Sequence, residues 1–204
     1  MLASSTIIED VDDMRKAGLA SLAYFYCDFR ERGKTGLRGL LSSLLVQLCH
    51  QSDAYYDVLF KFYSKHTNGL SHPSDNALVG CLKDLIYIPG LAPMYLIVDG
   101  LDECPKTSDI PSPRSKVLTL IEELIKLRFP NLRICVTSRP ETDIEHVLGR
   151  LNPHNISLHG ETGQQRDIED YIKSVINTHP ENISWKEEHK QLVVNDLTKK
   201  SDGM

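Results

Sequence analysis

The residue pattern with the clearest chemical meaning is an acidic cluster that directly follows an apolar run. The segment from Tyr95 to Glu103 reads YLIVDGLDE. Its apolar part predicts a buried parallel strand, and open α/β sheets bind ligands at the carboxyl ends of such strands. There Asp99 can hold Mg²⁺, often through water, while Asp102 and Glu103 can orient or deprotonate an attacking water. A solvated acidic turn is the simpler alternative, but this order of residues favours a phosphate site.

A second pattern, about 30 residues downstream, ends another apolar run with polar side chains. The run Leu132–Val136 is followed by Thr137, Ser138, Arg139 and Pro140. If both runs are neighbouring strands, Arg139 faces the same crevice as the acidic cluster, and its guanidinium is well matched to a terminal phosphate. Taken alone, Arg139 reads as a surface residue in a turn. The upstream acidic cluster favours the phosphate interpretation.

The elements that must position these residues alternate between strands and helices, which predicts an α/β fold with a mostly parallel sheet. The last strand is expected near residue 158, so we place a domain boundary near Gly160. Apolar runs predict strands at 22–29, 94–98, 132–136 and 156–158. Helical spacing of apolar residues predicts helices at 2–16, 37–49, 54–66, 75–86, 115–127, 141–148, from 164 onward and at 185–199.

Composition excludes several functional classes. The 204 residues are 41% hydrophobic and 25% charged with a net charge of −5, and no basic block indicates nucleic-acid binding. The five cysteines form no C-x-x-C pair, which favours a reducing, cytoplasmic compartment. No apolar run reaches the about 20 residues needed to span a bilayer, and the acidic start does not resemble a signal peptide, so no membrane association is expected. The histidines lack zinc-ligand spacing.

Four segments in this order resemble one family. They are LAYFYCDFR followed by LRGLLSSLLVQL (22–48), YLIVDGLDECP (95–105), ICVTSRPE (134–141) and DIEDYI (167–172). The chain is similar to the NACHT family of STAND P-loop NTPases, and more narrowly to the fungal-type, nephrocystin-like NACHT modules. The resemblance covers nearly the whole chain.

The resemblance implies a fold, a cofactor and residue roles. The expected fold is a three-layer αβα P-loop NTPase-like parallel sheet over 1–160, followed by the start of a helical subdomain over 161–204. Asp99 would be the Mg²⁺-associated Walker B aspartate, Asp102 and Glu103 would lie beside the hydrolytic water, and Arg139 would sense the γ-phosphate. Mg²⁺ and ATP or GTP are the implied cofactors. The implied partners are further copies of the chain or related NACHT proteins, brought together by nucleotide exchange.

The chain departs from the family in one respect. The family carries G-x-x-x-x-G-K-[ST], whose backbone N–H groups and lysine hold the phosphates, whereas the chain opens with Met1 in a segment that resembles the helix after that lysine. We therefore expect a piece that lacks the first strand and the phosphate loop, and that ends within the helical region. Gly33-Lys34-Thr35 follows a strand, but Asp28 occupies the position of the first glycine, where a carboxylate repels phosphate.

Three functional interpretations follow. The chain is a piece of a nucleotide-dependent signalling switch, or an interaction module derived from a NACHT NTPase that does not use nucleotide, or an autonomous enzyme that uses Gly33 to Thr35. The first is favoured, with weak or no ATP binding by the chain itself. The absence of the family's first strand is expected to leave a gap in the sheet or to force a new strand pairing.

Overall fold

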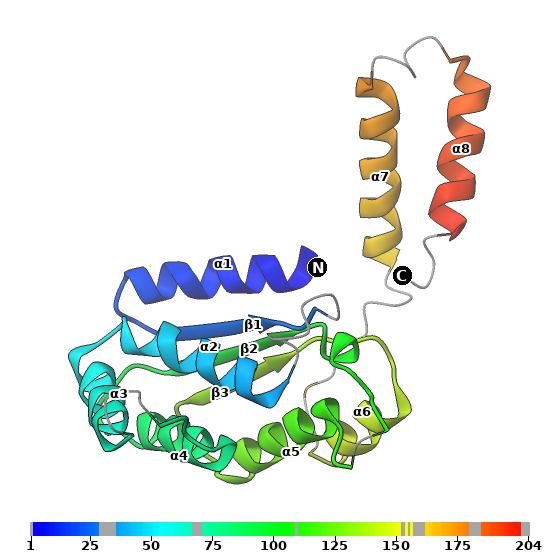
Figure 1. Ribbon diagram of the computed structural model, residues 1–204. Coiled ribbons are helices and arrows are strands. Elements are labelled where there is room, and N and C mark those ends of the chain that lie inside the picture. The colour runs from blue at the N-terminus through cyan, green and yellow to red at the C-terminus, as the bar shows by residue number, and fades with distance from the viewer. Residues whose placement is uncertain are drawn as a thin grey trace. The chain divides into compact units, whose positions relative to one another are not determined.

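The computed structural model describes residues 2–28, 36–66, 71–108, 110–151, 154, 156, 162–179 and 185–200. The chain divides into two compact units, residues 1–153 and 154–204. The first unit contains the sheet and the second is helical (Figure 1). Since the candidate site lies in the first unit, each unit is described by itself.

The sheet of the first unit has three parallel strands in the order β1-β2-β3. They are β1 (Ser21–Tyr26), β2 (Met94–Asp99) and β3 (Leu132–Val136). Tyr26 pairs with Asp99 across β1 and β2, and Val98 pairs with Val136 across β2 and β3. This register places the carboxyl ends of all three strands at one edge of the sheet. The segments that follow β2 and β3 therefore start next to each other.

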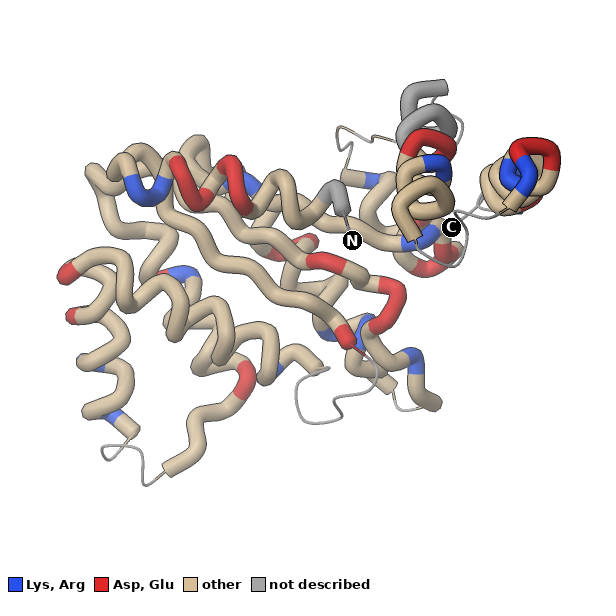
Figure 2. The backbone as a smooth tube through the Cα atoms, turned by 90° about the horizontal axis from the view of Figure 1, so that it is seen from above, with Lys and Arg blue, Asp and Glu red and all other residues tan. Residues whose placement is uncertain are grey.

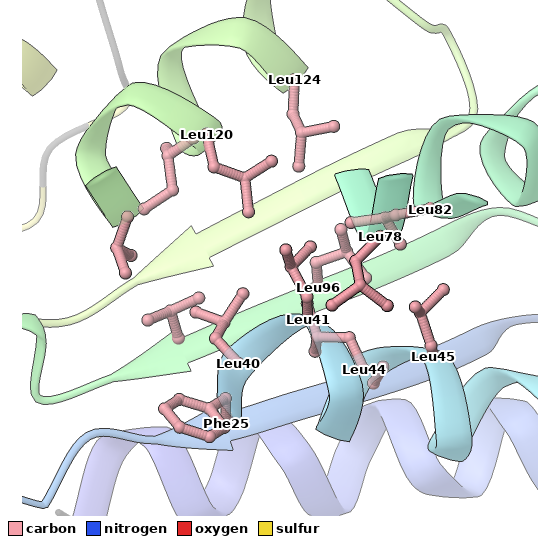
Figure 3. Close-up of a cluster of buried hydrophobic side chains, with 14 of the residues drawn as sticks. Phe25, Leu40, Leu41, Leu44, Leu45, Leu78, Leu82, Leu96, Leu120 and Leu124 are labelled. Carbon is pink, nitrogen blue, oxygen red and sulfur yellow. The ribbon is translucent and has the colours of Figure 1, made fainter. Parts of the chain in front are cut away.

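One face of the sheet carries most of the core. It is covered by α2 (Leu37–Cys49), α4 (Asp75–Ile86) and α5 (Pro113–Lys126), and α3 (Asp53–Lys65) packs against α2 and α4. Ser74 and Ser112 cap α4 and α5, each through its side-chain oxygen, as expected for helix N-caps. The shared core is rich in leucine, and Figure 3 shows part of it, with side chains from the sheet and from these helices.

The opposite face is covered by α1 (Leu2–Lys16). Val11 of α1 packs with Leu22 of β1 and Ile97 of β2 in a smaller cluster. The sheet thus has helices on both sides, and the three-layer αβα architecture expected from the sequence is confirmed (Figure 1).

The outer edge of β1 is occupied by two glutamine side chains, one from α2 (Gln47) and one from the turn that follows it (Gln51). The Gln51 amide accepts a hydrogen bond from Leu22 N at 2.9 Å and donates one to Leu22 O at 2.5 Å. The Gln47 amide does the same with Tyr24, at 3.0 and 2.7 Å. Each glutamine therefore binds the strand as the backbone of a neighbouring strand would.

After β3 the first unit ends with the short helix α6 (Thr142–Leu148) and a helical turn at Gly149–Leu151. The second unit contains α7 (Thr162–Thr178) and α8 (Glu187–Lys200). These two helices pack as a hairpin in which Ile176 and Val194 are buried. This is the helical appendage expected at the end of the chain.

Two sequence-based expectations differ from the structure or lie outside it. Among the described strands there is no gap, because β1, β2 and β3 pair in unbroken order. The other expected outcome, a new strand pairing, stays a prediction. Of the strand expected at 156–158, only Ile156 is described, and it is not part of a strand.

Candidate functional site

Asp99 ends β2 and is held in place by the segment that follows β3. Its side chain is buried, at 7% exposure, and its Oδ1 accepts a hydrogen bond from Thr137 Oγ1 at 2.5 Å. The same hydroxyl accepts from Gly100 N at 3.0 Å, and Leu101 N donates to Thr137 O at 2.9 Å. Thr137 thus fixes both the Asp99 carboxylate and the first turn of the acidic loop.

The loop after Asp99 turns sharply at Gly100. Its φ of 67° lies in the left-handed region, and a Cβ there would lie 3.5 Å from Cys27 O. A side chain at this position would be strained by the backbone conformation. The turn leads into a short 3₁₀ helix, Leu101–Glu103 (η2), whose Leu101 is fully buried. Burial of Leu101 anchors the loop, while Asp102 and Glu103 beside it stay partly exposed.

Asp102 and Arg139 are brought together, as the order of the strands predicts. Asp102 Oδ1 accepts a hydrogen bond from Arg139 N at 2.9 Å, and Asp102 Oδ2 lies 3.7 Å from Arg139 Nε. The Asp102 side chain is 11% exposed, whereas that of Arg139 is 80% exposed. The guanidinium is therefore tethered at its base but solvated, and it can reorient toward an anion that enters from solvent.

Arg114 is the residue of this region that the sequence analysis missed. It lies in the first turn of α5 and is 6% exposed. Its Nε donates to Cys104 O at 3.0 Å and its Nη2 donates to Asp102 O. Its Nη1 lies 3.5 Å from Glu141 and from Asp143. Arg114 thus connects the carbonyls of Asp102 and Cys104 to the start of α6. The only sequence signal was a charged residue in an apolar helix.

These residues border one pocket at the carboxyl edge of the sheet, with a volume of about 390 Å³. It is lined by Asp102, Glu103, Cys104, Pro105, Lys106, Arg114, Arg139 and Glu141. Asp99 is not part of its lining and lies behind the loop, against Thr137. The lining carries three acidic and three basic side chains, so the pocket offers no net positive charge to a polyphosphate.

The structure thus assembles Asp102, Glu103 and Arg139 around one pocket and places Asp99 at the strand end beside it. Lys34 and its neighbouring residues fall outside the described residues. No cluster of three or more histidine, cysteine, aspartate or glutamate side chains is arranged for a metal ion in the described part of the chain. An Mg²⁺ that is bound mainly by water and phosphate needs only one or two carboxylates, and the hard oxygen donor at Asp99 fits that requirement.

Charged side chains of both signs are distributed over the described residues. Figure 2 shows acidic and basic positions spread over helices and loops of the described chain, without an extended basic run. None of the described helices combines the length and the apolar character that a membrane crossing requires.

The chain matches a known protein family. The family described as "Nephrocystin 3, N-terminal" matches residues 1–139, which is about two thirds of the chain. The chain belongs to the nephrocystin 3 N-terminal family. The matched part of this nephrocystin 3 N-terminal module includes all three strands, the acidic loop and Arg139. No curated protein matches the chain.

The Thr137 hydroxyl gives a first test of the site in this nephrocystin 3 N-terminal module. Thr137→Val keeps the side-chain shape but leaves the Asp99 carboxylate without this donor and Gly100 N without this acceptor. We expect the free energy of unfolding to fall by about 2 kcal/mol, measured by urea denaturation. Thr119→Val is the matched control, because its exposed hydroxyl bonds only one carbonyl of its own helix at 2.9 Å. Equal losses in the two variants would contradict the bridging role.

Proposed function

We propose that this nephrocystin 3 N-terminal module is the nucleotide-facing part of a NACHT-type signalling switch. The observation that carries the proposal is the grouping of Asp102, Glu103 and Arg139 around one pocket at the carboxyl edge of a parallel sheet. Ligands of open α/β sheets bind at this edge. The chain resembles NACHT NTPases in the segments that build the pocket.

Each residue has a proposed role. Asp99 would hold Mg²⁺, which neutralises charge on the phosphate oxygens of bound ATP or GTP. The Thr137 hydroxyl keeps the Asp99 carboxylate in a single orientation. Asp102 and Glu103 would orient or deprotonate water, and Arg139 would bind the terminal phosphate. Of these groups, only the Arg139 guanidinium is largely solvated, so it is the one that can meet an incoming phosphate first.

The balance of charge in the pocket sets the expected affinity. Three carboxylates offset three basic side chains in its lining, and Asp102 Oδ2 already lies 3.7 Å from the guanidinium Nε of Arg139. A phosphate must therefore compete with a carboxylate for Arg139. We expect the chain alone to bind Mg²⁺-ATP weakly, with a Kd of about 1 mM or above, which corresponds to no more than about 4 kcal/mol.

Two-dimensional ¹H–¹⁵N NMR detects binding of this strength and locates it. Titration with Mg²⁺-ATP is expected to shift the amide signals of 99–104 and 137–139. ATP without Mg²⁺ is expected to shift them less, because the proposed metal at Asp99 would be missing. Arg139→Ala should abolish the shifts. Lys106→Ala is the matched control, since Lys106 lines the same pocket and is 57% exposed, and it should largely preserve them.

Two outcomes would overturn this proposal. If saturating Mg²⁺-ATP leaves the amide signals of 99–104 and 137–139 unshifted, the alternative of an interaction module that does not use nucleotide is favoured. Its structural support is that the Asp102 carboxylate already contacts both the backbone N and the guanidinium of Arg139. If shifts appear elsewhere and Lys34→Ala removes them, the nucleotide binds at Gly33 to Thr35 instead.

A further inference from the structure

Two buried cysteines meet beneath the acidic loop. Cys27 follows β1 and is 6% exposed, whereas Cys104 follows η2 and is 1% exposed. Their side chains are hydrogen-bonded to each other, and both residues are thiols in this structure. Cys27 N donates to Asp99 O at 2.9 Å, which holds the end of β1 against the start of the acidic loop, and Cys104 N donates to Leu101 O at 3.1 Å within that loop. The two sulfurs are thus adjacent although the residues are 77 positions apart.

The surroundings of the two thiols differ. Cys104 is one of the residues that line the pocket at the carboxyl edge of the sheet, so the pocket is the route by which a small oxidant would approach its buried thiol. The guanidinium of Arg114 donates to the Cys104 carbonyl and lies close to its side chain. The hydrogen bond from the Cys27 thiol, together with the Arg114 charge, lowers the pKa of Cys104 despite its burial. A thiolate is the reactive form of cysteine. Because Cys104 lines the pocket and Cys27 does not, Cys104 is the nucleophile of the pair.

We propose that Cys104 is a thiol oxidation site, with Cys27 as its resolving partner, and that a peroxide converts the two thiols into an intramolecular disulfide. In the first step the Cys104 thiolate attacks one oxygen of hydrogen peroxide; the O–O bond breaks, hydroxide leaves and Cys104 becomes a sulfenic acid. In the second step the Cys27 sulfur attacks the Cys104 sulfur and water leaves. Two thiols and one peroxide give one disulfide and two waters, with two electrons passed to the peroxide.

The disulfide would join the end of β1 to the end of η2. The acidic loop that leads to Cys104 carries Asp102 and Glu103, which line the pocket, so oxidation would restrain these two residues through one covalent bond. Reversible disulfides of this kind in reducing compartments are typically redox-sensing. The proposal concerns the thiols themselves and does not depend on nucleotide binding.

Peptide mapping of the oxidised full chain tests the proposal directly. Trypsin places the five cysteines on five different peptides, which are 17–30, 39–61, 66–83, 84–106 and 134–150. After brief treatment with hydrogen peroxide and alkylation of the remaining thiols, we expect 17–30 to be joined to 84–106. Dithiothreitol should release the two peptides. The pair should form at least about tenfold faster than Cys81 is oxidised, since burial raises the pKa of the Cys81 thiol to about 11 and leaves little thiolate.

One variant separates the two oxidation steps, and a second variant is its control. Cys27→Ala removes the resolving thiol, so oxidation should stop at a sulfenic acid on Cys104, which dimedone traps. The sulfenic acid should form more slowly than the disulfide does in the unmodified sequence, because the hydrogen bond that lowers the pKa of Cys104 is lost as well. Cys81→Ala is the matched control, because it also removes a buried thiol, and the joined peptide should form as in the unmodified sequence. If Cys27→Ala does not fold, the map of the unmodified sequence still decides. A map in which Cys104 stays alkylated, or in which the disulfides join two chains or involve Cys49 or Cys135, overturns the proposal.

Discussion

Replacing Arg114 by alanine is expected to lower the free energy of unfolding by about 3 kcal/mol. Arg114 is 6% exposed, and its guanidinium bonds the carbonyls of Asp102 and Cys104. Its removal leaves two acceptors of a buried turn without their donor, and it also removes the cation that faces Glu141 and Asp143. The loss is measured as a shift of the urea midpoint, followed by far-ultraviolet circular dichroism. Arg114→Lys should recover only part of it, because an ammonium cannot reproduce the planar donor fork.

The chain offers a matched control for this substitution. Arg38 also combines a bond to a carbonyl, that of Pro73 at 2.7 Å, with an ion pair, to Asp75 at 2.9 Å. Its side chain is 50% exposed, so water replaces its contacts when it is removed. Arg38→Ala should therefore cost less than about 1 kcal/mol. If Arg114→Ala is no more destabilising than Arg38→Ala, Arg114 does not hold the acidic loop.

Replacing Leu41 by alanine is expected to have an effect of similar or larger size, about 3 to 4 kcal/mol. Leu41 lies at the middle of α2 and is fully buried, in the cluster shown in Figure 3. The smaller side chain leaves a cavity between α2, the sheet and the neighbouring helices, and well-packed neighbours relax into it only in part. Urea denaturation measures the loss.

Val46 on the same helix is the control for Leu41. It is 53% exposed, so Val46→Ala removes methyl groups that are already in contact with water. The expected change is within about 0.5 kcal/mol. A large loss from Val46→Ala would mean that the exposed face of α2 is covered by a contact that this structure does not contain, and a small loss from Leu41→Ala would contradict the packing of the core.

The elements of the fold could be predicted from the sequence, because a helix or strand that is buried on one face repeats its apolar residues at a regular interval. The helix expected at 37–49 matches α2, and the strand expected at 132–136 matches β3. Where ends were misplaced, local chemistry explains the difference. The start of α5 was placed at 115, but Ser112 accepts from Ser115 N and Pro113 fits the first turn, so the helix begins two residues earlier.

The site was predictable only in part. Strand ends placed Asp99 and Arg139 near each other, since their strands are neighbours and parallel. The role of Thr137 depends on one hydroxyl that meets Asp99 and Gly100 across two strands, which no local pattern reveals. Arg114 lies ten residues beyond Cys104 and reaches back to the loop only because α5 starts beside it. Likewise, nothing in the spacing of Cys27 and Cys104 indicates that their thiols meet.

The glutamine pair on β1 has a consequence for assembly. Gln47 and Gln51 occupy the donors and acceptors of Leu22 and Tyr24 that an added strand would need. Free strand edges are where chains join into fibrils or accept extended peptides. With the β1 edge filled by side-chain amides, the described sheet can grow only beyond β3. If two copies pair through their β3 edges, neither copy has a second open edge among the described strands. Assembly by strand addition therefore stops at a dimer.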